Sequence, residues 1–154
     1  MKLSKKSKDA IRIAAWIPFI LYMVAMVYFL FFSEQLGRIP SDDYKYSLEP
    51  FKEIKRFLNN WRVIGIKGVV LNLVGNILAF VPFGFVLPVL SRTFRNGFHV
   101  TLLSLEFSLL VEVIQLVSKV GSFDVDDLIL NTIGGLTGYI LYRICERCLL
   151  RQKR

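Results

Sequence analysis

Three carboxylates stand within four residues, at Asp124, Asp126 and Asp127, where the apolar segment SFDVDDLILNTIGGLTGYILY begins. Asn131 follows one helical turn after Asp127, so these two side chains share a helix face. Carboxylates act as general acids or bases, bind cations, or accept hydrogen bonds from a ligand. A charged side chain inside a membrane costs about 3 kcal/mol on insertion scales, so these residues are candidate functional residues.

Two other apolar segments also contain polar pairs at helical spacing. Asn72 and Asn76 are four residues apart, and Glu112 and Gln115 are three apart. With the topology given below, all three pairs fall within roughly 12 Å of the outer membrane surface. The sequence therefore predicts one polar site in the outer leaflet, with Glu112 or Asp127 as the candidate general acid or base. The predicted binding residues are Asn72, Asn76, Glu112, Gln115, Asp124, Asp127 and Asn131.

The same residues contain no complete metal or cofactor motif. The acidic run starts like a calcium loop but lacks the glycine and the later glutamate of an EF-hand. No metal ligand is therefore assigned, although metal binding by these acids together with Glu112 stays open. Cys145 and Cys148 form a C-x-x-C without a second pair for zinc, and no phosphate-cradling loop is present. No cofactor is expected.

The elements that position these residues are long apolar helices. The chain has 154 residues, of which 54% are hydrophobic, and its mean hydropathy is +0.50. This composition is typical of a membrane protein. Four runs are long enough to cross about 30 Å of hydrocarbon: residues 13–32, 68–90, 98–117 and 125–145. We predict an all-α membrane protein with one domain over residues 1–154, a bundle of about four transmembrane helices.

The net charge of +8 reflects basic residues that gather before residue 13, at Arg92 and Arg95, and after residue 142. They do not follow one helix face, which argues against nucleic-acid binding. The positive-inside rule places both termini in the cytoplasm. The loop between the first two spans is also basic and mildly opposes this orientation.

That first loop contains an amphipathic segment, PFKEIKRFLNNW, at residues 50–61. Pro50 suits a first helical turn, and the polar face is mainly basic. We predict an interfacial helix in the first extracytoplasmic loop. Its basic face would attract an anionic lipid or a pyrophosphate-bearing headgroup, and the alternative is a simple connector that lies on the membrane. The apolar face consists of Phe51, Ile54, Phe57, Leu58 and Trp61.

Three blocks of sequence, NLVGNILAFVPFGFVLP, SLLVEVIQLV and GSFDVDDLILNTIGGLTGY, resemble the VanZ-like family in order and spacing. This family is known from teicoplanin resistance in bacteria, and the resemblance covers about half of the chain. It implies an integral protein of the bacterial cell membrane, without implying a settled biochemical activity. The residues on the family pattern are Asn76, Pro82, Gly84, Glu112, Gln115, Asp124, Asp127, Asn131 and Gly134.

Three functions from different classes fit these observations. The first is a membrane protein that binds a membrane lipid, a lipid-linked cell-wall precursor or a lipophilic glycopeptide at the outer leaflet, and so lowers teicoplanin susceptibility. The second is a membrane-embedded enzyme on a lipid-linked substrate, with Glu112 or Asp127 as its acid or base. The third is a proton-coupled transporter of a lipid or small molecule. A purely structural account makes the polar residues hydrogen-bonding contacts between helices.

Small residues in the last span allow close helix packing. Gly134 and Gly138 are four residues apart and let another helix approach to backbone distance. This stripe fits either a contact within the chain or a homo-oligomer. Glu106 lies outside the family pattern, near the middle of the third span, and the sequence assigns it no role.

Overall fold

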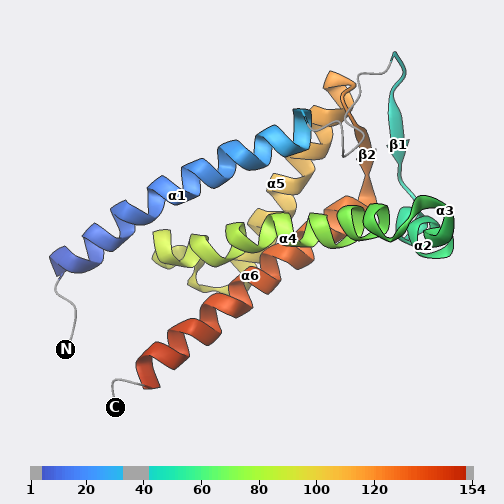
Figure 1. The fold of residues 1–154 in the computed structure, drawn as a ribbon. Coiled ribbons are helices and arrows are strands. Elements are labelled where there is room, and N and C mark those ends of the chain that lie inside the picture. Colours follow the sequence, from blue (N-terminus) through green and yellow to red (C-terminus); the bar gives the residue numbers. More distant parts are fainter. Residues whose placement is uncertain (1–4, 33–41, 152–154) are drawn as a thin grey trace.

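The structure is a computed structural model that describes residues 5–32 and 42–151. Figure 1 shows long helices that form a bundle, with a group of short elements at one end. The long helices are α1 (Lys5–Phe32), α4 (Ile66–Leu90), α5 (Gly97–Ser118) and α6 (Val125–Arg151). The short elements of that group are β1 (Lys45–Ser47), α2 (Lys52–Asn59), α3 (Trp61–Ile64) and β2 (Ser122–Asp124), and the 3-10 helix η2 (Arg92–Arg95) connects α4 to α5 at the opposite end.

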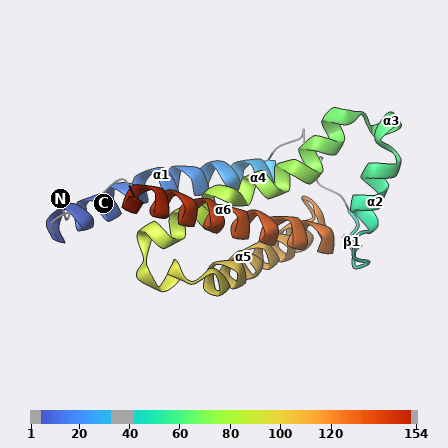
Figure 2. The same cartoon turned by 90° about the horizontal axis from the view of Figure 1, so that it is seen from below.

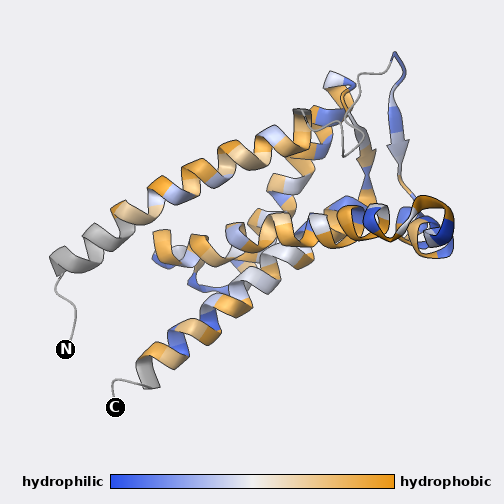
Figure 3. Ribbon diagram, viewed as in Figure 1, coloured by the Kyte–Doolittle hydropathy of each residue, from blue (hydrophilic) through white to orange (hydrophobic). Residues whose placement is uncertain are grey.

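Each of the four predicted runs forms a helix long and apolar enough to cross a membrane. Figure 3 shows the hydrophobic residues along these helices and the hydrophilic residues concentrated on the short elements. The predicted all-α membrane fold is therefore confirmed. The candidate spans are Ile13–Phe31, Ile66–Leu90, Gly97–Ser118 and Val125–Leu149.

Glycines hold α4 and α6 at backbone distance. A Cβ atom on Gly84 of α4 would lie 1.8 Å from the carbonyl oxygen of Gly135. On α6, a Cβ on Gly134 would lie 2.2 Å from the Ile77 oxygen, and one on Gly138 would lie 2.0 Å from the Val81 oxygen. The stripe predicted from Gly134 and Gly138 therefore serves a contact within the chain, because α4 covers both glycines.

An aromatic core joins the other two long helices to this pair. Phe83 of α4 stacks on Phe107 of α5 with ring centroids 5.2 Å apart, and Phe19 of α1 lies 6.2 Å from Phe83. Tyr22 of α1 donates its hydroxyl hydrogen to the backbone oxygen of Ala79. Aromatic pairs at these separations add about 1 kcal/mol each beyond the area they bury.

The two ends of the bundle differ in structure. The first turn of α1 and the last turn of α6 lie at one end, and α2, α3 and β1 lie at the other (Figures 1 and 2). At that second end β1 pairs in parallel with β2, with Lys45 opposite Ser122 and Ser47 opposite Asp124. This two-stranded sheet was not predicted, because strands of three residues leave almost no pattern in a sequence.

The amphipathic loop segment differs from its prediction in two ways. Pro50 lies outside the helix, because Phe51 is the N-cap and has a left-handed backbone with φ of 64°. The helix ends at Asn59, and Trp61 begins the separate helix α3. Ile54 and Phe57 are half-buried against the bundle, whereas Phe51, Leu58 and Trp61 remain exposed. The segment therefore turns only part of its apolar surface toward the protein.

Candidate functional site

The polar residues predicted to form a site gather where α6 begins. Asp124 is buried, and its Oδ1 accepts a hydrogen bond from the backbone N–H of Asp126 at 2.9 Å. This is the contact made by an N-cap residue, so Asp124 stabilises the first turn of α6. Its own backbone N–H donates to Oε2 of the buried Glu112, also at 2.9 Å. Glu112 on α5 therefore holds the start of α6 in place.

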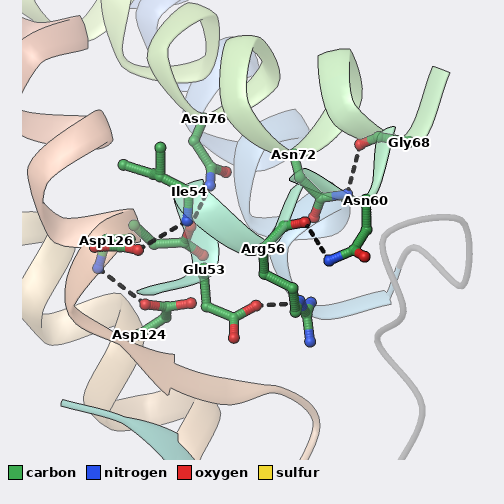
Figure 4. A network of polar contacts seen from close by, with 10 residues as sticks. Glu53, Ile54, Arg56, Asn60, Gly68, Asn72, Asn76, Asp124 and Asp126 are labelled. Carbon is green, nitrogen blue, oxygen red and sulfur yellow. Dashed lines mark hydrogen bonds and ion pairs between the residues drawn. The ribbon is translucent and has the colours of Figure 1, made fainter. Parts of the chain in front are cut away.

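Asp126 has a role that the sequence did not predict. Asp126 is only 1% exposed, and its carboxylate accepts a hydrogen bond from the backbone N–H of Phe51. It also accepts one from the backbone N–H of Ile54 at 3.0 Å (Figure 4). These groups belong to the first turn of α2, which makes no side-chain cap bond of its own. Asp126 thus caps a helix that lies more than 70 residues earlier in the chain. One feature of the sequence indicated that α2 needs a cap from elsewhere: the residues directly before Lys52, LEPF at 48–51, include no Ser, Thr, Asp or Asn.

Deeper contacts join α6 to α4 and α5. Asn76 of α4 donates its amide hydrogen to Oδ1 of Asp127. Asn131 is buried and donates to Oγ of Ser108 at 2.9 Å. Ser108, one turn before Glu112, was not among the predicted residues, although its spacing from Glu112 places it on the same face.

Two predicted residues point elsewhere. Asn72 donates to the backbone oxygen of Gly68, one turn back in its own helix, at 2.9 Å. Gln115 is buried and donates to the backbone oxygen of Leu30 at 2.8 Å, which attaches α5 to the end of α1. The structure therefore brings Asn76, Glu112, Asp124, Asp127 and Asn131 to the start of α6, and Asn72 and Gln115 make their hydrogen bonds outside that group.

Two buried amide oxygens lack a hydrogen-bond donor within the residues that the structure describes. They are Oδ1 of Asn131 and Oε1 of Gln115. A buried acceptor without a donor costs about 1–3 kcal/mol, so each atom is a position where a water molecule or a ligand hydroxyl adds stability.

Charges from α2 reach the same region. The Arg56 guanidinium lies 2.7 Å from the Glu53 carboxylate, and Figure 4 shows this pair beside Asp124 and Asp126. Burial raises the pKa of Asp124 to about 6, and the hydrogen bond from the Asp126 amide opposes part of this rise. Since Asp124 lies before the membrane span of α6, the loop end of the bundle contains a carboxyl group that titrates near neutral pH.

This titration predicts a pH-dependent stability. The folded pKa of Asp124 exceeds its ordinary value of 3.8, so the folded state holds the proton more tightly, and this contribution to stability is lost as the pH rises from about 4 through 6. We expect the midpoint of thermal unfolding in detergent to fall over that range. The part due to Asp124 should be about 2–4 °C, corresponding to about 1 kcal/mol after solvent screening.

The matched variants are Asp124→Asn, which keeps the acceptor for the Asp126 amide, and Asp42→Asn at an exposed position. Melting curves from pH 4 to 7 should lose this slope in Asp124→Asn and keep it in Asp42→Asn, within about 1 °C of the wild type. Equal slopes in all three proteins would contradict the assignment to Asp124.

The chemistry of the site is that of hydrogen bonding and charge. Within residues 13–31 and 42–149, no group of three His, Cys, Asp or Glu side chains is placed to hold a metal ion. The carboxylates of Asp124 and Asp126 accept backbone N–H groups, and Glu112 does the same. An arrangement of this kind fixes the geometry of the loop end and leaves the amide oxygen of Asn131 for a donor.

The sequence profile of the VanZ/LLP1 family matches residues 19–146, which includes all four candidate spans apart from a few terminal residues. This chain belongs to the VanZ/LLP1 family. A relative in that family, "Protein VanZ" of Enterococcus faecium, is 28% identical over 142 residues, which cover 86% of this chain and 76% of the relative. No solved structure matches the VanZ/LLP1 chain described here. The family resemblance expected from the three sequence blocks is therefore confirmed.

Proposed function

We propose that this VanZ/LLP1 protein binds a cell-envelope lipid or a lipid-linked wall precursor at the outer leaflet of the bacterial membrane, and so lowers susceptibility to teicoplanin-type glycopeptides. The proposal takes the end of the bundle with α2 and β1 as the outer end and both termini as cytoplasmic. The basic residues near the termini support this orientation.

The observation that carries the proposal is the capping of α2 by Asp126. It fixes an amphipathic helix beside the polar group formed by the buried Glu112 and Asp124 and the half-buried Asp127. On the outer side of this helix Lys52, Lys55 and Arg56 are exposed, and they suit an anionic phosphate headgroup. The exposed edge of Phe51, Leu58 and Trp61 suits the interface between headgroups and acyl chains.

The polar group supports a binding role more than a free acid or base. Glu112 accepts the Asp124 amide, and Asp127 accepts the amide of Asn76, so both candidate catalytic carboxylates already hold structural hydrogen bonds. In a binding role these carboxylates hold the surrounding residues in place and do not exchange protons with a substrate. A headgroup hydroxyl that donates a hydrogen bond to Oδ1 of Asn131 would satisfy that oxygen.

The test is antibiotic susceptibility in a teicoplanin-sensitive bacterium that expresses the protein. We expect the wild type to raise the inhibitory concentration of teicoplanin more than that of vancomycin. Asp127→Asn and Glu112→Gln, at equal membrane levels, should lower it to the value of empty-vector cells, because a neutral amide accepts the hydrogen bonds from Asn76 and from the Asp124 backbone more weakly than a carboxylate does and so loosens the loop end that positions α2. Asp42→Asn, which removes an exposed carboxylate from the same loop and leaves the ion pair of Glu49 with Lys52 intact, should keep the protection of the wild type.

Three outcomes would contradict the proposal in different ways. Protection that survives in both site variants would reduce the two carboxylates to hydrogen-bonding contacts between helices. No protection by the wild type would exclude a role in teicoplanin resistance. A chemically altered lipid in extracts of expressing cells would replace the binding role with an enzymatic one.

A further inference from the structure

The face of α5 that points away from the bundle has a regular pattern. Five exposed side chains follow one another at intervals of three, four, three and four residues: His99, Leu102, Glu106, Leu109 and Val113. We call these residues the α5 seam. The buried residues of α5, among them Ser104, Ser108 and Glu112, lie on the opposite side of the helix. A repeat of 3.5 residues is the pattern of positions a and d in a left-handed coiled coil.

Glu106 occupies the centre of the α5 seam. It is nine residues from Gly97 and twelve from Ser118, so it lies about 14 Å and about 18 Å from the two ends of the span. It is exposed, and no hydrogen bond or ion pair joins it to another residue in the part of the chain that the structure describes. An acid at that depth that faces lipid is costly, so a polar partner supplied by a second molecule would stabilise Glu106.

We propose that two copies of this protein associate side by side through the α5 seam, with the two Glu106 side chains in contact. A two-fold axis normal to the membrane makes the two α5 helices parallel and places identical residues at identical depth. The two Glu106 carboxyl groups then lie within hydrogen-bonding reach of each other across the axis. A single polar residue at a central a position is a known determinant of register and of a two-stranded state.

Two features favour a second copy of this protein as the molecule that packs on the α5 seam. The glycine stripe of α6, the other candidate for helix association, is covered by α4 of the same chain. The apolar members of the α5 seam, Leu102, Leu109 and Val113, match themselves across a two-fold axis without requiring any other sequence. The dimer surface lies on the opposite side of α5 from the proposed binding site and does not depend on its function.

Cysteine cross-linking tests the register of this contact. In a background with Cys145 and Cys148 replaced by serine, Leu109→Cys and Val113→Cys should form disulfide-linked dimers in native membranes. Ile114→Cys is the matched control, because Ile114 is 44% exposed and Val113 is 42% exposed, yet only Val113 belongs to the α5 seam. Cross-linking of Ile114→Cys as efficient as that of Val113→Cys, or no cross-linking at all, would overturn the proposal.

The role of Glu106 is tested by energy transfer between labelled copies in liposomes. Glu106→Gln keeps a donor and an acceptor and should dimerise like the wild type. Glu106→Leu inserts into the membrane more readily but lacks the hydrogen bond, so its dimer should dissociate about 3- to 30-fold more readily. A wild type that stays monomeric in liposomes, or a Glu106→Leu dimer as stable as the wild type, would overturn the assignment.

Discussion

Replacing Gly84 by alanine is expected to destabilise the bundle by about 3 kcal/mol or more, because the added methyl group meets backbone that cannot move aside. The new Cβ would lie 1.8 Å from the Gly135 oxygen and 2.9 Å from its Cα, so α4 and α6 must separate along their whole contact. A rigid backbone contact costs more than a contact with the end of a flexible side chain. The measurements are the yield of monodisperse protein in detergent and its midpoint of thermal unfolding.

Gly75→Ala is the matched control for this variant, because Gly75 lies in the same helix and a Cβ there would meet no atom within 4 Å. Alanine favours a helix over glycine by about 1 kcal/mol, so this control should be as stable as the wild type or slightly more stable. If both variants unfolded at the temperature of the wild type, the inference that α4 and α6 pack at backbone distance at Gly84 would be wrong.

The second large effect is expected at Asp126. Asp126→Ala removes the carboxylate that accepts the N–H groups of Phe51 and Ile54, and α2 then has no cap. Hydrogen bonds to a charged group contribute about 1.5–3 kcal/mol each, so loss of both should raise the opening of α2 by about 100-fold or more. Hydrogen exchange of the backbone amides of Lys52–Asn59 measures this opening directly.

Glu53→Gln provides the comparison for this experiment. It removes the ion pair with Arg56, three residues along the same helix and partly exposed to solvent, which contributes about 0.5 kcal/mol. Exchange in α2 should therefore change by only about twofold in this variant. If Asp126→Ala exchanged no faster than Glu53→Gln, the cap would not be what holds α2 on the bundle.

The sequence predicted those parts of the fold that follow from a pattern of residues within one segment of the chain. Each span is a long apolar run, so its helix follows from length and hydropathy alone. Polar residues at helical spacing and similar depth predicted that Asn76 and Asp127 lie in one layer, and the structure adds the hydrogen bond between them. The close approach of Gly134 and Gly138 to α4 followed from the small size of glycine.

The parts that could not be predicted join distant segments of the chain. The pairing of Tyr46 with Phe123 involves strands too short to show alternation. Asp126 lies in the first turn of its own helix, where acids are common, so nothing in the sequence pointed to a bond with Ile54 of another helix. Gln115 was placed in the polar site because its spacing from Glu112 fits, but its rotamer points toward α1.

The cap on α2 also sets an order of events during synthesis. Phe51 leaves the ribosome 75 residues before Asp126, and a ribosome that adds about 5–20 residues per second needs about 4–15 seconds to cover that distance. During this interval α2 has no cap and β1 has no partner strand, because β2 also follows later in the chain. Slow codons between residues 51 and 126 therefore lengthen the time in which this loop is open to proteases.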